Sequence, residues 1–365
     1  MHQLNDTVPQ PILSPLSPLR APAPLKIGIV GLGFGQYILN LLSHEPANRH
    51  FATAAVCDMR PDVARETAAR LGVPAHASLD ALLEDDEIDV VGLFTQPIGR
   101  AQLLRKIIRA GKDVLTTKPF ELDPVEARSV LEEARDLGRV IHLNSPAPLP
   151  TRDLRLIGQW RDAYDLGRPI GGRAAVWASY QEAADGTWQD NPESCPAAPL
   201  FRIGIYLMHD LGGIFGPAES VQLMASSIRT GRPTPDNAQI NIAYRNGALG
   251  HVFASFCVDD GDQYQNSMAL QFERGTIYRN MGGLRGDAFE PESAEMVLVA
   301  RRKGGREVIE HAQVDEMAGA YLWAALAEQI RERRPLDDGY IDRIVDGVRL
   351  IDAMRRAQRT GSARL

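Results

Sequence analysis

The feature that most constrains the fold is a short apolar run that enters a helix through glycines. Residues 26–30 (KIGIV) predict a buried strand, 31–36 (GLGFGQ) follow directly, and 34–44 carry helical apolar spacing. A strand, a glycine turn and a helix in this order are typical of nucleotide-binding α/β domains. Gly31 would permit the tight turn and Gly33 the close approach of a pyrophosphate, which a helix N-terminus attracts. A purely structural glycine turn is the alternative.

The third glycine of this fingerprint is displaced. The usual spacing puts it at position 36, where the chain has Gln36, and Gly35 lies one place early. We therefore expect the first helix to pack slightly farther from the first strand than is usual.

Strand-like and helix-like segments alternate up to about residue 148. They lie at 51–58, 61–72, 88–95, 99–111, 113–120, 124–138 and 139–145. This alternation predicts βαβ units, and so an α/β Rossmann domain over 25–148 with a parallel, doubly wound sheet.

The second half has a different texture. Strand-like runs dominate from about residue 169, and Asn246-Gly247 between two of them is a strong hairpin signal. RKGGRE (302–307) predicts another turn. We expect an α+β domain over 149–340 with an open, mostly antiparallel sheet for substrate binding and oligomerisation, and a C-terminal helix over 341–365. Residues 1–24 hold six prolines and predict a disordered or polyproline-like tail, or an arm that packs on a neighbouring subunit.

The composition excludes several function classes. A net charge of −7 with mixed signs offers no footprint for nucleic acid, and no apolar run reaches the length of a membrane span. Three scattered cysteines form neither a disulfide framework nor a zinc motif, so we expect a cytoplasmic protein. The eight histidines show no convincing ligand spacing, so we expect no metal site.

A carboxylate ends the second predicted strand. Asp58 lies 27 residues after Gly31, where it could accept hydrogen bonds from an adenosine ribose and repel a 2′-phosphate, which favours NAD. Arg60 could instead hold the 2′-phosphate of NADP. A solvated strand-end aspartate is the plainer interpretation of Asp58.

A lysine ends another predicted strand, in VLTTKPF (114–120). Lys118 is followed at once by Pro119. A charge in that place is either a solvated strand end or a working group at the mouth of a cleft.

The sequence resembles the glucose–fructose oxidoreductase/inositol dehydrogenase (Gfo/Idh/MocA) family from about residue 25 to 361. The resemblance is carried by GIVGLGFG (28–35), Asp58, TQP (95–97), AGKDVLTTKP (110–119), GIYLMHDLGGIFGP (204–217) and the last helix up to RTG (359–361). It implies a Rossmann domain followed by an open antiparallel sheet that often builds dimers or tetramers. The expected cofactor-binding residues are Gly31, Gly33, Phe34, Gly35, Asp58, Arg60, Thr95, Pro97, Lys118 and Pro119.

The resemblance also implies catalytic roles. The lysine of this motif projects between cofactor and substrate in the family, and the peptide bond to the following proline is cis in several relatives. Lys118 would then have a depressed pKa and relay the proton of the reacting hydroxyl. Tyr206 falls at the family's acid/base histidine, and His209 lies on roughly the same helix face. A core tyrosine is the alternative for Tyr206.

Other positions depart from the family pattern. Arg202 replaces a substrate-orienting aspartate, which suggests an acidic substrate held by a guanidinium fork, or else an exposed arginine at a helix start. Thr117 replaces a common glutamate, and Arg100 replaces a histidine found near the nicotinamide in many members. Tyr180 and Trp188 could form an apolar wall for a sugar ring; core or interface packing is the alternative.

These observations predict an NAD(P)-dependent oxidoreductase. It would transfer a hydride between nicotinamide and a hydroxyl or carbonyl carbon of a sugar, polyol or sugar acid, with NAD as the expected cofactor. Two other functions stay open: a redox-neutral NAD-dependent glycoside-processing enzyme, and a non-catalytic nucleotide-binding sensor. The expected partners are a small sugar-like substrate and further copies of the chain, as a homodimer or homotetramer joined through the open sheet.

Overall fold

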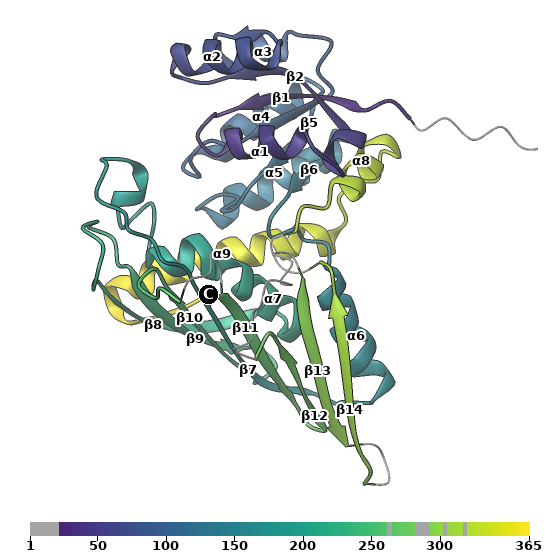
Figure 1. Cartoon of the computed structure of the whole chain (residues 1–365), viewed down its shortest axis with the longest axis vertical. Helices are drawn as coiled ribbons and strands as arrows, with labels where there is room; N and C mark the ends of the chain where they lie inside the picture. The colour runs from purple at the N-terminus through teal and green to yellow at the C-terminus, as the bar shows by residue number, and fades with distance from the viewer. Residues whose placement is uncertain (1–21, 261–264, 282–292, 302–304, 317–319) are drawn as a thin grey trace, which may run out of the picture.

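The computed structural model describes residues 22–260, 265–281, 293–301, 305–316 and 320–365. Most of the proline-rich tail and part of the predicted turn at 302–307 lie outside these residues. The chain forms two layered units, one above the other in Figure 1, each built on its own sheet.

The first unit is the predicted Rossmann domain. Its six-stranded parallel sheet has the order β3-β2-β1-β4-β5-β6. The strands are β1 (Leu25–Val30), β2 (Phe51–Cys57), β3 (Ala75–His76), β4 (Val90–Leu93), β5 (Asp113–Thr116) and β6 (Ile141–Leu143), and the helices are α1 (Gly35–Leu42), η1 (Ala47–Arg49), α2 (Pro61–Leu71), α3 (Leu79–Leu83), α4 (Arg100–Arg109) and α5 (Pro124–Asp136).

Local sequence signals explain where these helices begin and end. The Asp123 side chain accepts hydrogen bonds from the N–H groups of Val125 and Glu126, and Pro124 opens α5 with a backbone suited to the first turn. Gly72 ends α2 in the left-handed conformation, with φ of 69°. Neighbouring apolar residues of one strand face opposite sides of the sheet and belong to two separate buried clusters. Helices pack on both faces and bury these residues.

The second unit holds a nine-stranded sheet in the order β14-β13-β12-β11-β7-β10-β9-β8-β15. All neighbours are antiparallel except β7 and β10. The strands are β7 (Pro169–Trp177), β8 (Ala218–Ser226), β9 (Asn237–Tyr244), β10 (Leu249–Ser255), β11 (Gln265–Phe272), β12 (Gly275–Arg279), β13 (Ala294–Arg301), β14 (Glu307–Val314) and β15 (Ser362–Arg364).

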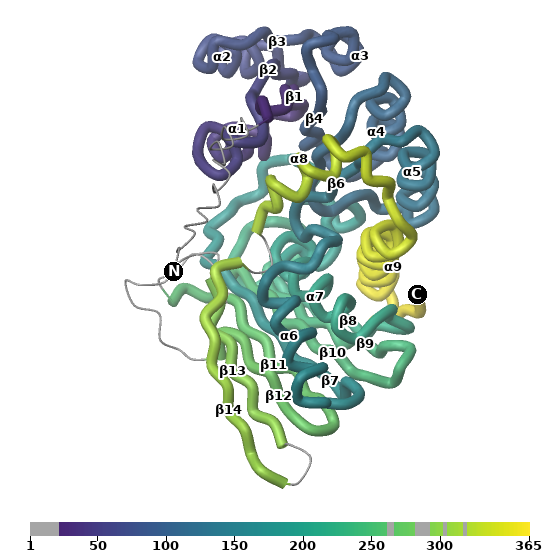
Figure 2. Tube along the Cα trace, turned by 90° about the vertical axis from the view of Figure 1, so that its right-hand side faces the viewer, coloured from purple at the N-terminus to yellow at the C-terminus, as the bar shows by residue number. Residues whose placement is uncertain are grey.

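The predicted hairpin is confirmed. Gly247 has a φ of 88° at the turn between β9 and β10, and the Asn246 side chain accepts from the N–H of Ala248. The second unit also contains α6 (Arg152–Ala163), the short 3₁₀ turn η2 (Trp188–Asp190), the π-helical turn η3 (Leu200–Gly204) and α7 (Ile205–Phe215). In Figure 2, α6 and α7 lie against one face of the sheet.

The last two large helices connect the units. Helix α8 (Trp323–Arg331) returns to the Rossmann domain, where Trp323 packs edge-on against Phe51 with ring centroids 5.9 Å apart. Helix α9 (Asp338–Thr360) runs between the two units in yellow in Figure 1. Its first half joins the Rossmann core and its second half joins the core of the second unit. None of the helices in the described residues is long and apolar enough to cross a membrane.

Candidate active site

The glycine turn between β1 and α1 leaves room for a ligand. Gly31 has a φ of 88°, and a Cβ there would lie 2.8 Å from the carbonyl oxygen of Phe94, so only glycine fits. At Gly33 a Cβ would meet nothing within 4 Å, so the backbone is open at that point. The N-terminus of α1 follows this turn directly, and a helix N-terminus attracts an anion through its N–H groups and its dipole.

Gly35 takes the place of the displaced third glycine. A Cβ at Gly35 would lie 3.0 Å from Cγ2 of Ile29, so α1 approaches β1 closely at this residue. The wider packing expected from Gln36 is therefore wrong. The Gln36 side chain instead reaches α2, where its amide donates to Oγ1 of Thr67 at 2.7 Å.

Asp58 is tied to the glycine turn. Its carboxylate accepts from the Leu32 N–H at 2.6 Å and from the backbone N–H and Nε of Arg60 at 2.9 Å and 3.1 Å. Partial burial raises the pKa of Asp58, but these hydrogen bonds outweigh it, so the pKa lies below its ordinary value. The carboxylate is thus charged at neutral pH and fixed beside the turn, whereas the Arg60 side chain is largely exposed.

Lys118 lies just after β5 and reaches across to the second unit. Its Nζ donates to the carbonyl oxygen of Arg202 at 2.5 Å and lies 5.5 Å from the ring centroid of Tyr206. The Lys118–Pro119 peptide bond is cis, as the resemblance to the family suggested. Burial, followed by the charge of Arg202, lowers the pKa of Lys118 to about 8. The side chain is therefore held in the gap between the units and can be neutral near physiological pH.

Helix α7 carries the two other predicted catalytic residues. Tyr206 is half-buried beside Lys118, as the resemblance implied. His209, one turn farther on, donates from Nε2 to the carbonyl oxygen of Ala147 at 3.0 Å. Burial, followed by the charge of Arg343, lowers the pKa of His209 to about 4, so the ring is neutral. His209 thus connects α7 to the segment that follows β6.

Arg202 is already paired. Both of its terminal nitrogens donate to Glu182, at 2.6 Å and 2.8 Å. Its guanidinium lies over the rings of Tyr180 and Phe256, at 5.0 Å and 4.8 Å from their centroids. The charge of Arg202 is therefore already balanced by Glu182, which does not favour the expectation that this arginine binds an acidic substrate. Glu182 could not be predicted as this partner, because it lies in an irregular segment with no sequence pattern that would pair it with residue 202.

Tyr180 and Trp188 lie in the same region as Arg202. Tyr180 stacks on Phe256 with centroids 4.7 Å apart, and Trp188 packs against Phe201 at 6.1 Å. Arg232 fastens the segment between them by ion pairs to Glu182, Asp185 and Asp190. Both aromatic rings are half-buried, so their outer faces can line the substrate side of the site.

The carboxyl ends of the Rossmann strands fit a nicotinamide dinucleotide. Among the described residues, Oγ1 of Thr95 after β4 and the side-chain amide of Asn144 after β6 are buried with no hydrogen-bond partner. Buried polar groups of this kind are usually satisfied by a ligand or by water. They lie at the same edge of the sheet as Gly33, Asp58 and Lys118, which is where doubly wound sheets bind nucleotides. Within the same described part, no group of three or more His, Cys, Asp or Glu side chains is placed to hold a metal ion.

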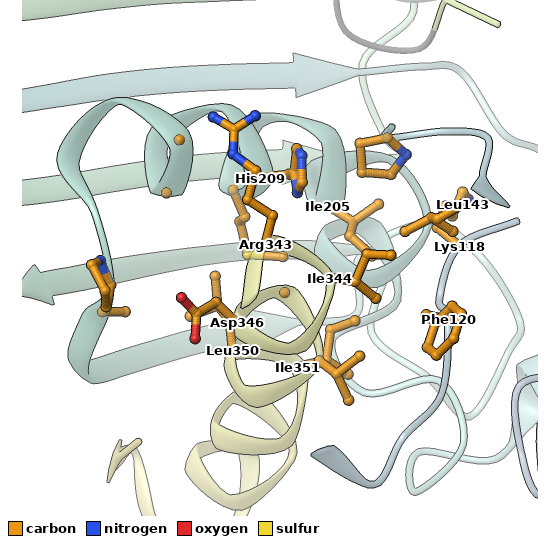
Figure 3. A pocket seen from close by; sticks show the side chains of 18 of the residues that line it. Lys118, Phe120, Leu143, Ile205, His209, Arg343, Ile344, Asp346, Leu350 and Ile351 are labelled. Carbon is orange, nitrogen blue, oxygen red and sulfur yellow. The ribbon is translucent and has the colours of Figure 1, made fainter. Parts of the chain in front are cut away.

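A cavity of about 80 Å³ lies behind this site, between α7 and α9. Figure 3 shows Lys118 and Phe120 along one side, Ile344 and Ile351 from α9 facing them, and the Arg343 guanidinium beside His209. The lining is mostly apolar and includes the glycines Gly212, Gly213, Gly216 and Gly347. The cavity thus touches the stem of the candidate catalytic lysine without containing Tyr206.

Replacing a glycine inside helix α7 should stabilise the fold. Gly212 lies inside α7, and a Cβ there would meet nothing within 4 Å, so Gly212→Ala should raise the free energy of unfolding by about 0.5–1 kcal/mol. Gly213→Ala is the matched control, because its Cβ would lie 2.9 Å from Nη2 of Arg343 and would displace that guanidinium. Denaturant unfolding of both variants measures the difference. Equal or lower stability of Gly212→Ala would contradict the prediction.

Comparison with known proteins identifies the family. A profile of the oxidoreductase family with an NAD-binding Rossmann fold matches residues 25–145, and the GFO/IDH/MocA C-terminal domain matches residues 154–278. The chain belongs to the Gfo/Idh/MocA oxidoreductase family. Its first domain is therefore the family's NAD-binding Rossmann domain, and its second sheet is the family's C-terminal domain.

Individual relatives of the family are distant. Trans-1,2-dihydrobenzene-1,2-diol dehydrogenase of Bos taurus is 23% identical over 253 residues, which are 69% of this chain and 72% of that protein. Uncharacterized oxidoreductases of Schizosaccharomyces pombe and Synechocystis match at 24–26% identity, and the chain spans only 54–58% of their length.

Solved structures of the family share the whole fold. An NADPH-dependent oxidoreductase from Desulfitobacterium hafniense superposes with a TM-score of 0.73 at 14% identity, covering 93% of this chain and 97% of that one. Levoglucosan dehydrogenase in complex with NADH and L-sorbose gives 0.70 at 16% identity, covering 93% and 98%. These neighbours bear on the fold alone; one is named for NADPH and the other is in complex with NADH.

Proposed function

We propose that the chain is an NAD-dependent dehydrogenase that oxidises a CH–OH group of a neutral sugar, polyol or related cyclic diol, or reduces the corresponding carbonyl. The observation that carries this proposal is Lys118: a half-buried amine with a pKa of about 8, held at the strand edge where the Rossmann domain binds its cofactor. The geometry of Tyr206 and the paired state of Arg202 support a neutral substrate beside that amine.

Lys118 would manage the proton of the reacting hydroxyl. A neutral amine has two N–H groups and one lone pair. One N–H donated to the Arg202 carbonyl oxygen holds the nitrogen in place, and the lone pair can take the hydroxyl proton. The bound nicotinamide supplies the hydride acceptor. In the reverse direction, the ammonium of Lys118 returns its proton to the carbonyl oxygen, and Tyr206 lies close enough to share this role.

Three other side chains would hold the reactants. Asp58 would accept from the adenosine ribose hydroxyls, and the N-terminus of α1 would bind the pyrophosphate. Tyr180 and Trp188 would pack against a ring of the substrate. The sequence expectation of a homodimer or homotetramer stays a prediction; the sheet face opposite α7, with exposed Met224 and Leu249, is where a second copy would pack.

The proposal is tested by following absorbance at the NADH band. Purified protein is given NAD or NADP in turn with polyols, aldoses, sugar acids and cyclic vicinal diols, and NAD binding is measured separately by calorimetry. Turnover of a neutral hydroxylated substrate supports the proposal. Tight NAD binding with no turnover on the whole panel would overturn it and favour the redox-neutral or sensor functions.

Asp58 should set the preference for NAD over NADP. In Asp58→Asn the negative charge is lost while the acceptor for the Leu32 N–H can be kept, so the ratio of NAD to NADP efficiency should fall by about tenfold, or about 1.4 kcal/mol. Arg60→Ala is the control, because its exposed guanidinium should matter little for NAD. The measurement is kcat/KM for both cofactors. An unchanged ratio in Asp58→Asn, or a loss of NAD efficiency in Arg60→Ala, would contradict this assignment.

A further inference from the structure

Arg100, the first residue of α4, is buried behind the cofactor edge. Its side chain is 1% exposed, and among the described residues its guanidinium donates only to backbone carbonyl oxygens. The acceptors are Thr117 at 2.6 Å, Phe120 at 3.4 Å, and Pro119 and Thr95 in shorter contacts. By sequence, Arg100 stands where many members of the family have a histidine near the nicotinamide. In the structure its side chain lies behind the two loops that follow β4 and β5.

These contacts begin where the sheet ends. The parallel ladder between β4 and β5 runs from Val90 paired with Asp113 to Leu93 paired with Thr116, and stops there. The residues that follow, 94–97 and 117–120, leave the sheet side by side as separate loops. No ladder hydrogen bond joins them, but one nitrogen of Arg100 binds the first loop and the other binds the second. The fork therefore extends the connection between the two strands beyond their ends.

The charge of Arg100 is retained at this depth. Burial lowers its pKa to about 10, opposed by Glu121, so the guanidinium is protonated at neutral pH. Glu121 is buried as well, and its carboxylate accepts from the N–H groups of Ala101 and Leu122. Arg100 thus places a fixed positive charge near Lys118, which adds to the effects of burial and Arg202 on that amine.

We propose that Arg100 is a positioning residue for the reaction: it sets the separation of the Thr95 loop from the Lys118 loop, and so the place of the lysine relative to the nicotinamide. This inference rests on the proposed function. Arginine suits the task because its planar fork binds two loops at once, whereas the single nitrogen of a lysine cannot hold carbonyl oxygens on both sides in the same geometry. A displacement of about 1 Å at such a site can cost about 10²-fold in rate.

Two variants separate the fork from the charge. Arg100→Lys keeps a positive charge and loses the fork, and Arg100→Met loses both. We expect kcat to fall by about 10²-fold in each and NADH to bind more weakly, with a smaller change in substrate KM. The reactivity of Lys118 is measured on the protein without cofactor, by acetic anhydride labelling across pH and mass spectrometry, with Lys112 as the internal reference. The pH midpoint of Lys118 labelling should stay unchanged in Arg100→Lys and move to higher pH in Arg100→Met.

Arg100→Gly with added guanidinium ions tests the same point by rescue, and Arg279→Met, which removes a buried arginine of the second unit, controls for loss of folded protein. The proposal is overturned if Arg100→Lys keeps wild-type kcat and NADH affinity, or if the losses in every variant follow the folded fraction and the Lys118 midpoint does not move in Arg100→Met. Should Arg100→Met fail to fold, Arg100→Lys still decides. If the wild-type protein turns over no substrate, the proposed function has failed, while NADH affinity and Lys118 labelling still test Arg100.

Discussion

Lys118→Ala is expected to lower kcat by about 10²–10⁴-fold and to leave NAD affinity nearly unchanged. In the proposed mechanism the amine takes the substrate proton, and its removal leaves the glycine turn and Asp58 intact because these follow other strands. Steady-state kinetics with the best substrate of the panel, together with NAD titration by fluorescence, measures both quantities. Lys112→Ala is a matched control, since Lys112 binds the carbonyl oxygens of Asp85 and Ile88 at the opposite end of β5.

The pH dependence of the reaction shows whether Lys118 acts as a base in oxidation and as an acid in reduction. Because burial lowers the pKa of Lys118 to about 8, the amine becomes neutral as pH rises through that value. Oxidation needs the neutral amine, so its rate should rise through about pH 8 and then level off; reduction needs the ammonium and should show the opposite trend. Lys118→Ala should lose this limb in both directions. A limb that persists in the variant would assign the proton to another group, with Tyr206 the first candidate.

Arg279→Met is expected to lower the free energy of unfolding by about 3–5 kcal/mol. Arg279 of β12 is 1% exposed and donates to Asp153 at the start of α6 and to Asp210 of α7, the latter at 2.9 Å. Burial raises the pKa of Asp210 above its ordinary value, although Arg279 opposes this. Removing the arginine leaves two carboxyl groups buried together without their cation. Denaturant unfolding followed by circular dichroism measures the loss.

The triad offers its own control. Replacing all three residues at once, as Asp153→Asn, Asp210→Asn and Arg279→Met, removes the three charges of this cluster and should recover much of the stability lost in the single variant. The exposed pair of Arg168 and Glu273 is the second control, and Arg168→Ala should cost at most about 1 kcal/mol. A triple variant less stable than Arg279→Met would show that the triad contributes through its contacts rather than through charge balance.

Much of the fold was predictable from local patterns. Alternating apolar segments predicted the parallel sheet, the glycines predicted the turn between its first strand and helix, and Asn246-Gly247 predicted a hairpin that is present. These signals are local because periodicity shows which face of an element is buried and turn residues show where the chain reverses. Lys118 could be singled out because a charged residue directly after a buried strand is either a solvated strand end or a functional group.

The pairings between distant segments could not be predicted. Glu182 meets Arg202, Arg100 binds two loops, and Gly35 replaces the missing third glycine. Each depends on how separate elements are placed in space, and one sequence carries no signal of that placement. The parallel pairing of β7 with β10 and the return of α8 to the first domain are of the same kind.

Helix α9 has a consequence for how the protein admits its reactants. Its 23 residues span about 35 Å, with Ile341 and Val345 in one core and Ile351 and Met354 in the other. A swing of one unit against the other would have to pull apolar side chains out of close packing at one end of this helix. The distance between the carboxyl edge of the Rossmann sheet and the segment around Tyr180 is therefore set when the chain folds, so reactants would have to enter and leave without a swing of one unit against the other.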